Sequence, residues 1–175
     1  MTMTALISII CEDHPGLIAD VTGRLFDLGV NLGDTTFAVL GGGAEFTLVA
    51  KLPAGLGLGE IEQELKTLKR LRDAKLTVSA FAFRETHDEQ AHITHRVEIT
   101  GDDSPGLVAR LSEALPKFGA NIVRLNSESM PSESGARFLL RMALSVPPAK
   151  AASCMATVAN TASQLNLKCH WQQVG

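Results

Sequence analysis

The chain of 175 residues has no tyrosine, one tryptophan, three cysteines and no long apolar run. Its cysteines, Cys11, Cys154 and Cys169, are odd in number and lack Cys-x-x-Cys spacing, which excludes a disulfide framework and a cysteine zinc site. No apolar run reaches the roughly 20 residues that span a bilayer, so we expect no membrane partner. The apolar stretch at residues 5–11 is short and has no basic residue before it. We interpret it as a strand rather than a signal peptide and expect the protein in the cytoplasm.

A basic cluster of the kind that binds nucleic acid is missing as well. The net charge of −3 is divided into −2 over residues 1–84, −3 over residues 85–92 and +2 over residues 93–175. Nucleic-acid-binding proteins concentrate lysine and arginine on one face or in one segment, and no basic cluster in this sequence resembles such a footprint. We therefore expect no direct contact with nucleic acid, and any effect on DNA would pass through a second protein.

The residue sets of common catalytic centres are also missing. We find no pair of carboxylates and no Ser-His-Asp arrangement that would form an active site. Cys11 lies near His14, but a cysteine at the end of a strand is more often a core residue than a nucleophile. The segment Gly41-Gly42-Gly43 lacks the Lys-Ser/Thr of a phosphate-binding loop and is interpreted as a hairpin connection. We expect no enzyme activity and no cofactor.

Three histidines near the middle of the chain are the candidate metal ligands. His87, His92 and His95 lie in or beside a polar segment. No helix is predicted there to align their side chains, so we favour solvated histidines over a metal site.

The most informative feature that is present is an internal repeat. Residues 12–32, EDHPGLIADVTGRLFDLGVNL, return 90 positions later as residues 102–122, DDSPGLVARLSEALPKFGANI. An aspartate, a Pro-Gly-Leu segment, a glycine and an asparagine keep their relative places. The repeat predicts two copies of one small unit, and small units gain stability by burying surface against each other or against a second chain.

Hydrophobic periodicity predicts the same order of elements in both halves. In the first half, strands are expected at residues 5–11, 35–40, 45–52 and 76–83, with helical apolar stripes at Leu17, Ile18, Val21, Leu25 and Leu28 and at Ile61, Leu65, Leu68 and Leu71. In the second half, strands are expected at residues 94–100, 123–130, 136–146 and 166–173, a turn at 131–135, one helix from Leu107 and another over 149–165. This order predicts an α+β fold of two ferredoxin-like βαββαβ units, each an antiparallel sheet with helices on one face. The expected domains are residues 1–84 and 93–175, joined by a linker at 85–92.

The two halves differ in three respects. Pro116 takes the place of Phe26 and is expected to kink or shorten its helix. Residues 94–100 alternate between apolar and polar, whereas residues 5–11 are almost continuously apolar. This predicts more cover on the second face of the first sheet, so its face or edge is expected to meet the other unit or another subunit, for example in a homodimer. The smaller Ser104 also takes the place that His14 has in the first half.

The repeated loop has the chemistry to bind an amino acid. A helix N-terminus offers free N–H groups to a carboxylate, glycine allows close approach, and aspartate accepts from an ammonium. The candidate ligand-binding residues are Asp13, His14, Gly16, Leu17, Asn31, Asp103, Ser104, Gly106, Leu107 and Asn121. We favour the second loop slightly, because Ser104 is small.

A purely structural interpretation of the same motif stays open. The Asp-x-Pro-Gly pattern is also a common turn and helix start, with aspartate or serine as the cap, and Gly-x-Asn is a common helix end. The two loops therefore need not perform the same task.

These motifs, Asp13-His14-Pro15-Gly16-Leu17 with Gly29-Val30-Asn31 and their copies from Asp103 to Asn121, resemble the ACT domain. The tandem arrangement and the segment Ala44-Glu45-Phe46-Thr47 are similar to the glycine cleavage system transcriptional repressor family. The resemblance implies amino-acid binding at the loop between the first strand and first helix, where two units adjoin side by side. It also implies action on transcription through an activator protein.

The resemblance leads us to expect a cytoplasmic regulatory protein that binds a small amino acid, with glycine as a candidate ligand. Two alternatives remain: a protein-interaction module without a ligand, and a regulatory subunit of an enzyme of amino-acid metabolism.

Overall fold

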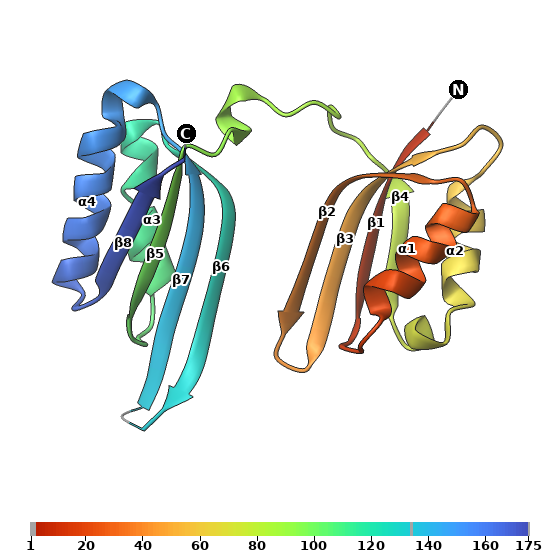
Figure 1. The fold of residues 1–175 in the computed structure, drawn as a ribbon, viewed down its shortest axis with the longest axis horizontal. Coiled ribbons are helices and arrows are strands. Elements are labelled where there is room, and N and C mark those ends of the chain that lie inside the picture. The colour runs from red at the N-terminus through yellow and green to blue at the C-terminus, as the bar shows by residue number, and fades with distance from the viewer. Residues whose placement is uncertain (1–2, 134, 175) are drawn as a thin grey trace. The chain divides into compact units, whose positions relative to one another are not determined.

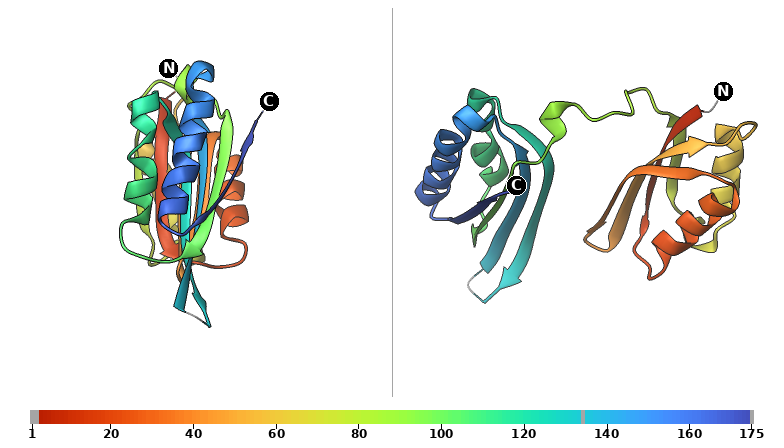
Figure 2. Two further views of the ribbon diagram at one scale, coloured as in Figure 1. Left: turned by 90° about the vertical axis from the view of Figure 1, so that its left-hand side faces the viewer. Right: turned by 45° about the horizontal axis from the view of Figure 1, so that its top comes forward.

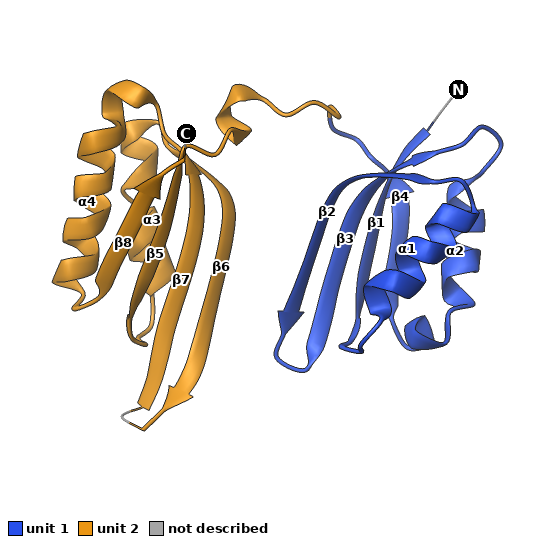
Figure 3. Cartoon of the chain, viewed as in Figure 1, with its two compact units in different colours: residues 1–83 blue, residues 84–175 orange. Residues whose placement is uncertain are grey.

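The computed structural model describes residues 3–133 and 135–174 and divides the chain into two compact units, residues 1–83 and 84–175 (Figure 3). Ser134, within the turn expected at 131–135, lies outside the described residues. Each unit has its own sheet, helices and apolar core.

The first unit is a four-stranded antiparallel sheet with helices on one face (Figures 1 and 2). Its elements in chain order are β1 (Met3–Glu12), α1 (Leu17–Asp27), β2 (Asn31–Leu40), β3 (Gly43–Leu52), α2 (Leu58–Lys66), the 3₁₀ turn η1 (Lys69–Leu71) and β4 (Lys75–Ala80). The strand order β2-β3-β1-β4 leaves β2 and β4 at the edges.

The second unit repeats this arrangement. Its elements are β5 (His95–Asp102), α3 (Leu107–Ser112), the 3₁₀ turn η3 (Leu115–Phe118), β6 (Asn121–Ser132), β7 (Gly135–Ser145), the 3₁₀ turn η4 (Pro148–Lys150), α4 (Ala151–Gln164) and β8 (Lys168–Gln173). The strand order is β6-β7-β5-β8, and all three pairs are antiparallel. The predicted pair of ferredoxin-like βαββαβ units is confirmed.

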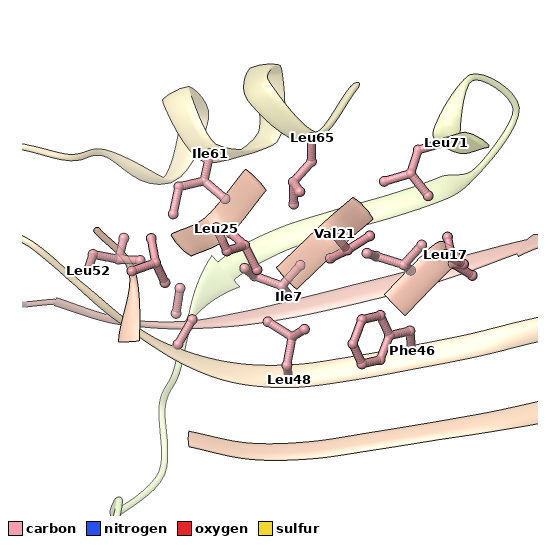
Figure 4. Close-up of a cluster of buried hydrophobic side chains, with 14 of the residues drawn as sticks. Ile7, Leu17, Val21, Leu25, Phe46, Leu48, Leu52, Ile61, Leu65 and Leu71 are labelled. Carbon is pink, nitrogen blue, oxygen red and sulfur yellow. The ribbon is translucent and has the colours of Figure 1, made fainter. Parts of the chain in front are cut away.

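Alternating strand residues and one stripe of each helix form the first core (Figure 4). Leu17, Val21 and Leu25 of α1 are buried against Ile7 of β1 and Phe46 of β3. Each such side chain contributes about 1.5–3 kcal/mol when fully buried.

One residue assigned to this stripe does not belong to the core. Ile18 is 43% exposed, so the prediction that it faces the core is wrong. It follows Leu17 directly, and consecutive residues of a helix point about 100° apart.

Helix lengths follow local backbone chemistry. The α3 helix ends at Ser112, and the 3₁₀ turn that follows contains Pro116, which confirms the predicted shortening. The predicted extension of the second helical stripe to Leu71 is wrong, because α2 ends at Lys66. The hydroxyl of Thr67 donates to the carbonyl of Glu64 at 2.6 Å, and such bonds compete with helix continuation.

The segment interpreted as a linker is partly ordered. It contains the 3₁₀ turn η2 (Glu89–Ala91). The Arg84 guanidinium donates to both carboxylate oxygens of Asp88, at 2.7 and 2.9 Å. The side-chain amide of Asn121 donates to the carbonyl of Gln90 at 2.9 Å, which ties η2 to the first residue of β6.

Candidate ligand site

The backbone of the loop between β1 and α1 requires glycine. Gly16 precedes α1 with φ +89°, and Gly106 precedes α3 with φ +83°. Residues with a Cβ rarely adopt this left-handed conformation. Pro15 therefore lies in the turn before α1 rather than in its first helical turn. Backbone conformation accounts for Gly16 and Gly106, whether or not a ligand approaches them.

The aspartates of the two loops do not cap their helices. Neither α1 nor α3 has a side-chain cap hydrogen bond, so the prediction that Asp or Ser serves as the cap is wrong. The main-chain N–H groups of Asp13 and Asp103 instead donate to Gly42 and Ala136, at 3.1 and 2.9 Å. Both side chains are exposed, and within residues 3–133 and 135–174 neither carboxylate forms a hydrogen bond or ion pair. Both are available to accept from an ammonium group.

Free donors lie in the first turn of α1, which follows the loop that holds Asp13. The N–H groups of Leu17 and Asp20 donate to the main-chain carbonyls of His14 and Gly16, at 3.2 and 3.0 Å respectively. The N–H groups of Ile18 and Ala19 have no acceptor among the described residues. These two groups belong to the positive end of the helix dipole. The side chains of Leu17 and Leu107 are buried in the two cores, so only their main chains face the loops.

Two basic side chains of η1 flank the first loop and were missed by sequence reasoning. A hollow of about 420 Å³ is lined by His14, Pro15, Lys69 and Arg70. The Arg70 guanidinium pairs with Asp20 at 2.6 Å. Its other terminal nitrogen lies 3.4 Å from where a Cβ on Gly16 would stand. The basic run at residues 69–72 was the available signal, but its position 50 residues from Asp20 hid the contact.

An apolar hollow adjoins the same loop. It measures about 540 Å³ and is lined by residues 13–19, Phe37 and Val39. Ile18, Val39 and Leu40 are 43%, 52% and 63% exposed. Since β2 is an edge strand, the exposed apolar side chains of its last two residues lie where another chain could pair with it.

The structure does not bring Asn31 to this loop within one unit. Asn31 pairs with Lys51, which pairs with Thr4 near the start of β1, whereas Asp13 follows the end of β1. Eight strand residues separate the two ends, a length of about 26 Å. Figure 1 shows the β1–α1 loop at the lower end of the first unit and the start of β2 at the upper end.

The second loop lacks the basic flank of the first. Asp103, Ser104 and Gly106 are exposed. Among the described residues of this unit no 3₁₀ turn separates α4 from β8, so there is no counterpart of η1 with its Lys69 and Arg70. Asn121, the counterpart of Asn31, donates its side-chain hydrogen bond to the carbonyl of Gln90. The two loops share a backbone, and their surroundings differ.

The candidates for metal binding and catalysis, the histidines and Cys11, remain to be placed in the fold. His95 is only 3% exposed, so the expectation of a solvated histidine is wrong; it lies on the helix-facing side of β5, where its ring contacts Trp171. Burial lowers the pKa of His95. Burial, and then the charge of Asp13, raises the pKa of the Cys11 thiol, which disfavours the nucleophilic thiolate. Among the described residues no group of His, Cys, Asp or Glu is arranged to hold a metal ion.

The ACT domain family matches twice, at residues 5–70 and at residues 96–172. This chain belongs to the ACT domain family and carries two of these regulatory domains in tandem. No curated protein matches it. In the described part of the chain, no helix has both the length and the apolar character of a membrane span.

Two solved structures share the whole tandem fold. An unknown protein from Galdieria sulphuraria superposes with a TM-score of 0.75 at 20% identity, over 100% of both chains. A candidate glycine cleavage system transcriptional repressor superposes with a TM-score of 0.69 at 15% identity, over 99% of this chain and 98% of that one. At these identities the similarity concerns the fold.

Proposed function

We propose that this chain is a cytoplasmic regulatory protein that binds a small amino acid at the β1–α1 loop of its first unit and modulates transcription through a protein partner. Glycine is the first candidate ligand. The observation that carries the proposal is the unpaired Asp13 carboxylate in the loop before α1, together with the free N–H groups of Ile18 and Ala19 in the first turn of that helix. An α-amino acid presents an ammonium and a carboxylate a few ångströms apart, which matches one acceptor and two donors.

The charges around the loop support an anionic group on the ligand. Lys69 and Arg70 place two cations at the hollow beside Pro15. Asp20 already pairs with Arg70, which leaves the Lys69 ammonium for the ligand carboxylate. Within the described residues Lys69 has no ion-pair partner.

The position of Asn31 supports a site completed by a second copy of the chain. Two β2 edges that pair antiparallel place the first residue of one strand beside the last residues of the other. Asn31 of the partner subunit would then lie next to Val39 and Leu40, at the loop. This pairing would also cover the exposed side chains of Ile18, Val39 and Leu40.

Charge at the β2 edge tests this assembly. A lysine on an edge strand opposes strand pairing. We expect Val39→Lys to shift the sedimentation of the protein from dimer to monomer. Phe83→Lys, which changes an equally apolar and 77% exposed residue outside β2, should leave the dimer intact. A wild-type monomer with and without glycine would remove the second copy from the proposal.

The transcriptional role is supported by one structural relative, named as a candidate glycine cleavage system transcriptional repressor. A pull-down from native lysate tests it, performed once with glycine at about 1 mM and once after the glycine has been diluted 10-fold. We expect a DNA-binding regulator to be captured in a glycine-dependent manner, and Asp13→Asn to remove that dependence. Capture of an enzyme of amino-acid metabolism instead would assign the chain to the alternative role of regulatory subunit.

A further inference from the structure

The face of the second sheet that its helices leave open carries a hollow of about 480 Å³. On this face β6, β7, β5 and β8 contribute a row of paired residues, namely Arg124, Ala143, Arg96 and Gln172. The four residues of this row line the hollow. Neighbouring strands lie about 4.8 Å apart, so the Cα atoms of Arg124 and Arg96 are about 10 Å apart across Ala143. The single methyl group of Ala143 leaves the space between the two arginines open.

A second row limits the hollow along the strands. It consists of Asn126, Arg141, Glu98 and His170. Arg141 is neutralised, because its guanidinium lies 3.0 Å from Glu98 and 3.6 Å from Glu128. Arg96 and Arg124 have no carboxylate within ion-pair distance among the described residues. The lining therefore holds three arginines against one glutamate, and two guanidiniums are unpaired.

The first unit shows that the fold does not require charge at these positions. The 90-residue repeat and the strand register place Leu6 and Val49 where the second unit has Arg96 and Ala143. They place Ser8 and Thr47 where it has Glu98 and Arg141, and these two hydroxyl groups lie 3.4 Å apart. The same sheet thus forms with neutral side chains at these four positions. Arg96, Glu98 and Arg141 therefore carry charge that the sheet does not need in order to fold.

We propose that this hollow binds a small organic dianion, carrying either two carboxylates or a phosphate, between Arg96 and Arg124. A guanidinium binds a carboxylate or phosphate through two parallel hydrogen bonds. The two unpaired guanidiniums match the two charges of a dianion, and the volume falls in the range of small-molecule sites. Asn126 and Gln172 add amide donors at either side. The site is separate from the β1–α1 loop of the first unit and does not depend on amino-acid binding there.

Calorimetric titration of the full chain with succinate, and separately with inorganic phosphate, tests the proposal. We expect saturable binding of one of these probes. The double variant Arg96→Gln/Arg124→Gln should weaken it at least about tenfold for each guanidinium removed. The control Arg110→Gln/Lys117→Gln removes the same charge from a hollow on the helical side and should change the affinity less than about twofold.

Ala143→Val tests the geometry without changing charge. Valine fills the gap between the arginines, and the first unit carries Val49 at the matching place, so the unfolding temperature should be retained while probe binding is lost. Saturation by succinate alone would identify a dicarboxylate class, and saturation by phosphate alone a phosphate class. The proposal is overturned if neither probe saturates below about 10 mM, or if the control pair weakens binding as much as the double variant. Binding only of an oligoglutamate peptide would overturn it too, in favour of a protein-docking surface.

Discussion

The side-chain amide of Asn121 donates a 2.9 Å hydrogen bond to the carbonyl of Gln90, whereas the matching Asn31 makes no side-chain hydrogen bond within the described residues. The two Gly-x-Asn motifs have the same place in the repeat and in the fold. One asparagine holds the η2 segment that precedes β5, and the other is free of hydrogen bonds to the described residues at the start of an edge strand. The two copies of the repeat therefore share a topology, but their matching asparagines have different roles.

Substituting the two asparagines separates these uses. Asn121→Ala should lower the free energy of unfolding by about 0.5–1 kcal/mol, because one intramolecular hydrogen bond is lost, and should leave glycine binding unchanged. Asn31→Ala should weaken glycine binding and leave the free energy of unfolding unchanged. Chemical denaturation and calorimetry on both variants check this. If Asn31→Ala binds glycine like the wild type, Asn31 has no part in the site.

Because His95 is buried, we expect the free energy of unfolding to fall in mild acid. Its buried ring lies 2.9 Å from the Thr94 hydroxyl, and burial lowers its pKa below the usual 6.5. The unfolded chain then takes up a proton before the folded chain does. Its contribution to stability is complete above about pH 6.5 and is lost as the pH falls toward the lowered pKa, by at most about 1.4 kcal/mol per pH unit.

Denaturation at pH 7.5 and 5.5 measures this effect. The loss of unfolding free energy over that interval should be smaller in His95→Gln than in the wild type, since the carboxylates of both proteins are the same. Equal losses would show that His95 takes up its proton as readily in the folded protein as in the unfolded chain.

Two glycines of the first helix region should respond to alanine in opposite directions. Gly23 lies inside α1, and a Cβ there meets no atom within 4 Å, so Gly23→Ala should stabilise the protein by about 0.5–1 kcal/mol. Gly16→Ala should destabilise it by about 1 kcal/mol, because φ is +89°. Urea denaturation of both variants decides the matter. A stabilising Gly16→Ala would contradict the left-handed turn before α1.

The fold could be predicted from the sequence because its information is local. The spacing of Leu17, Val21 and Leu25 defines the buried stripe of α1, and Gly29 with φ +72° follows its end. Repetition of the pattern in the second half then fixed the architecture. The shortening of α3 likewise followed from one residue, Pro116.

The surroundings of the candidate site could not be predicted, because they depend on contacts distant in sequence. Arg70 reaches Asp20 and the edge of Gly16 through the turn after α2, which no periodicity reports. Asn31 is close to Asp13 in the motif but lies at the far end of β2. The burial of His95 is the exception, because the alternation of residues 94–100 already places it on the same side of β5 as Val97 and Ile99, although the polar segment before it favoured an exposed histidine.

The measurement that tests the central proposal most directly is calorimetric titration of glycine, and then of the other common amino acids, into the wild type and two variants. Asp13→Asn removes the acceptor of the first loop, and Asp103→Asn makes the same change in the loop that lacks the Lys69 and Arg70 flank. We predict saturable binding of a small amino acid that is lost in Asp13→Asn and retained in Asp103→Asn. Absence of heat with every amino acid, or binding that survives Asp13→Asn unchanged, would contradict amino-acid sensing at the β1–α1 loop of the first unit.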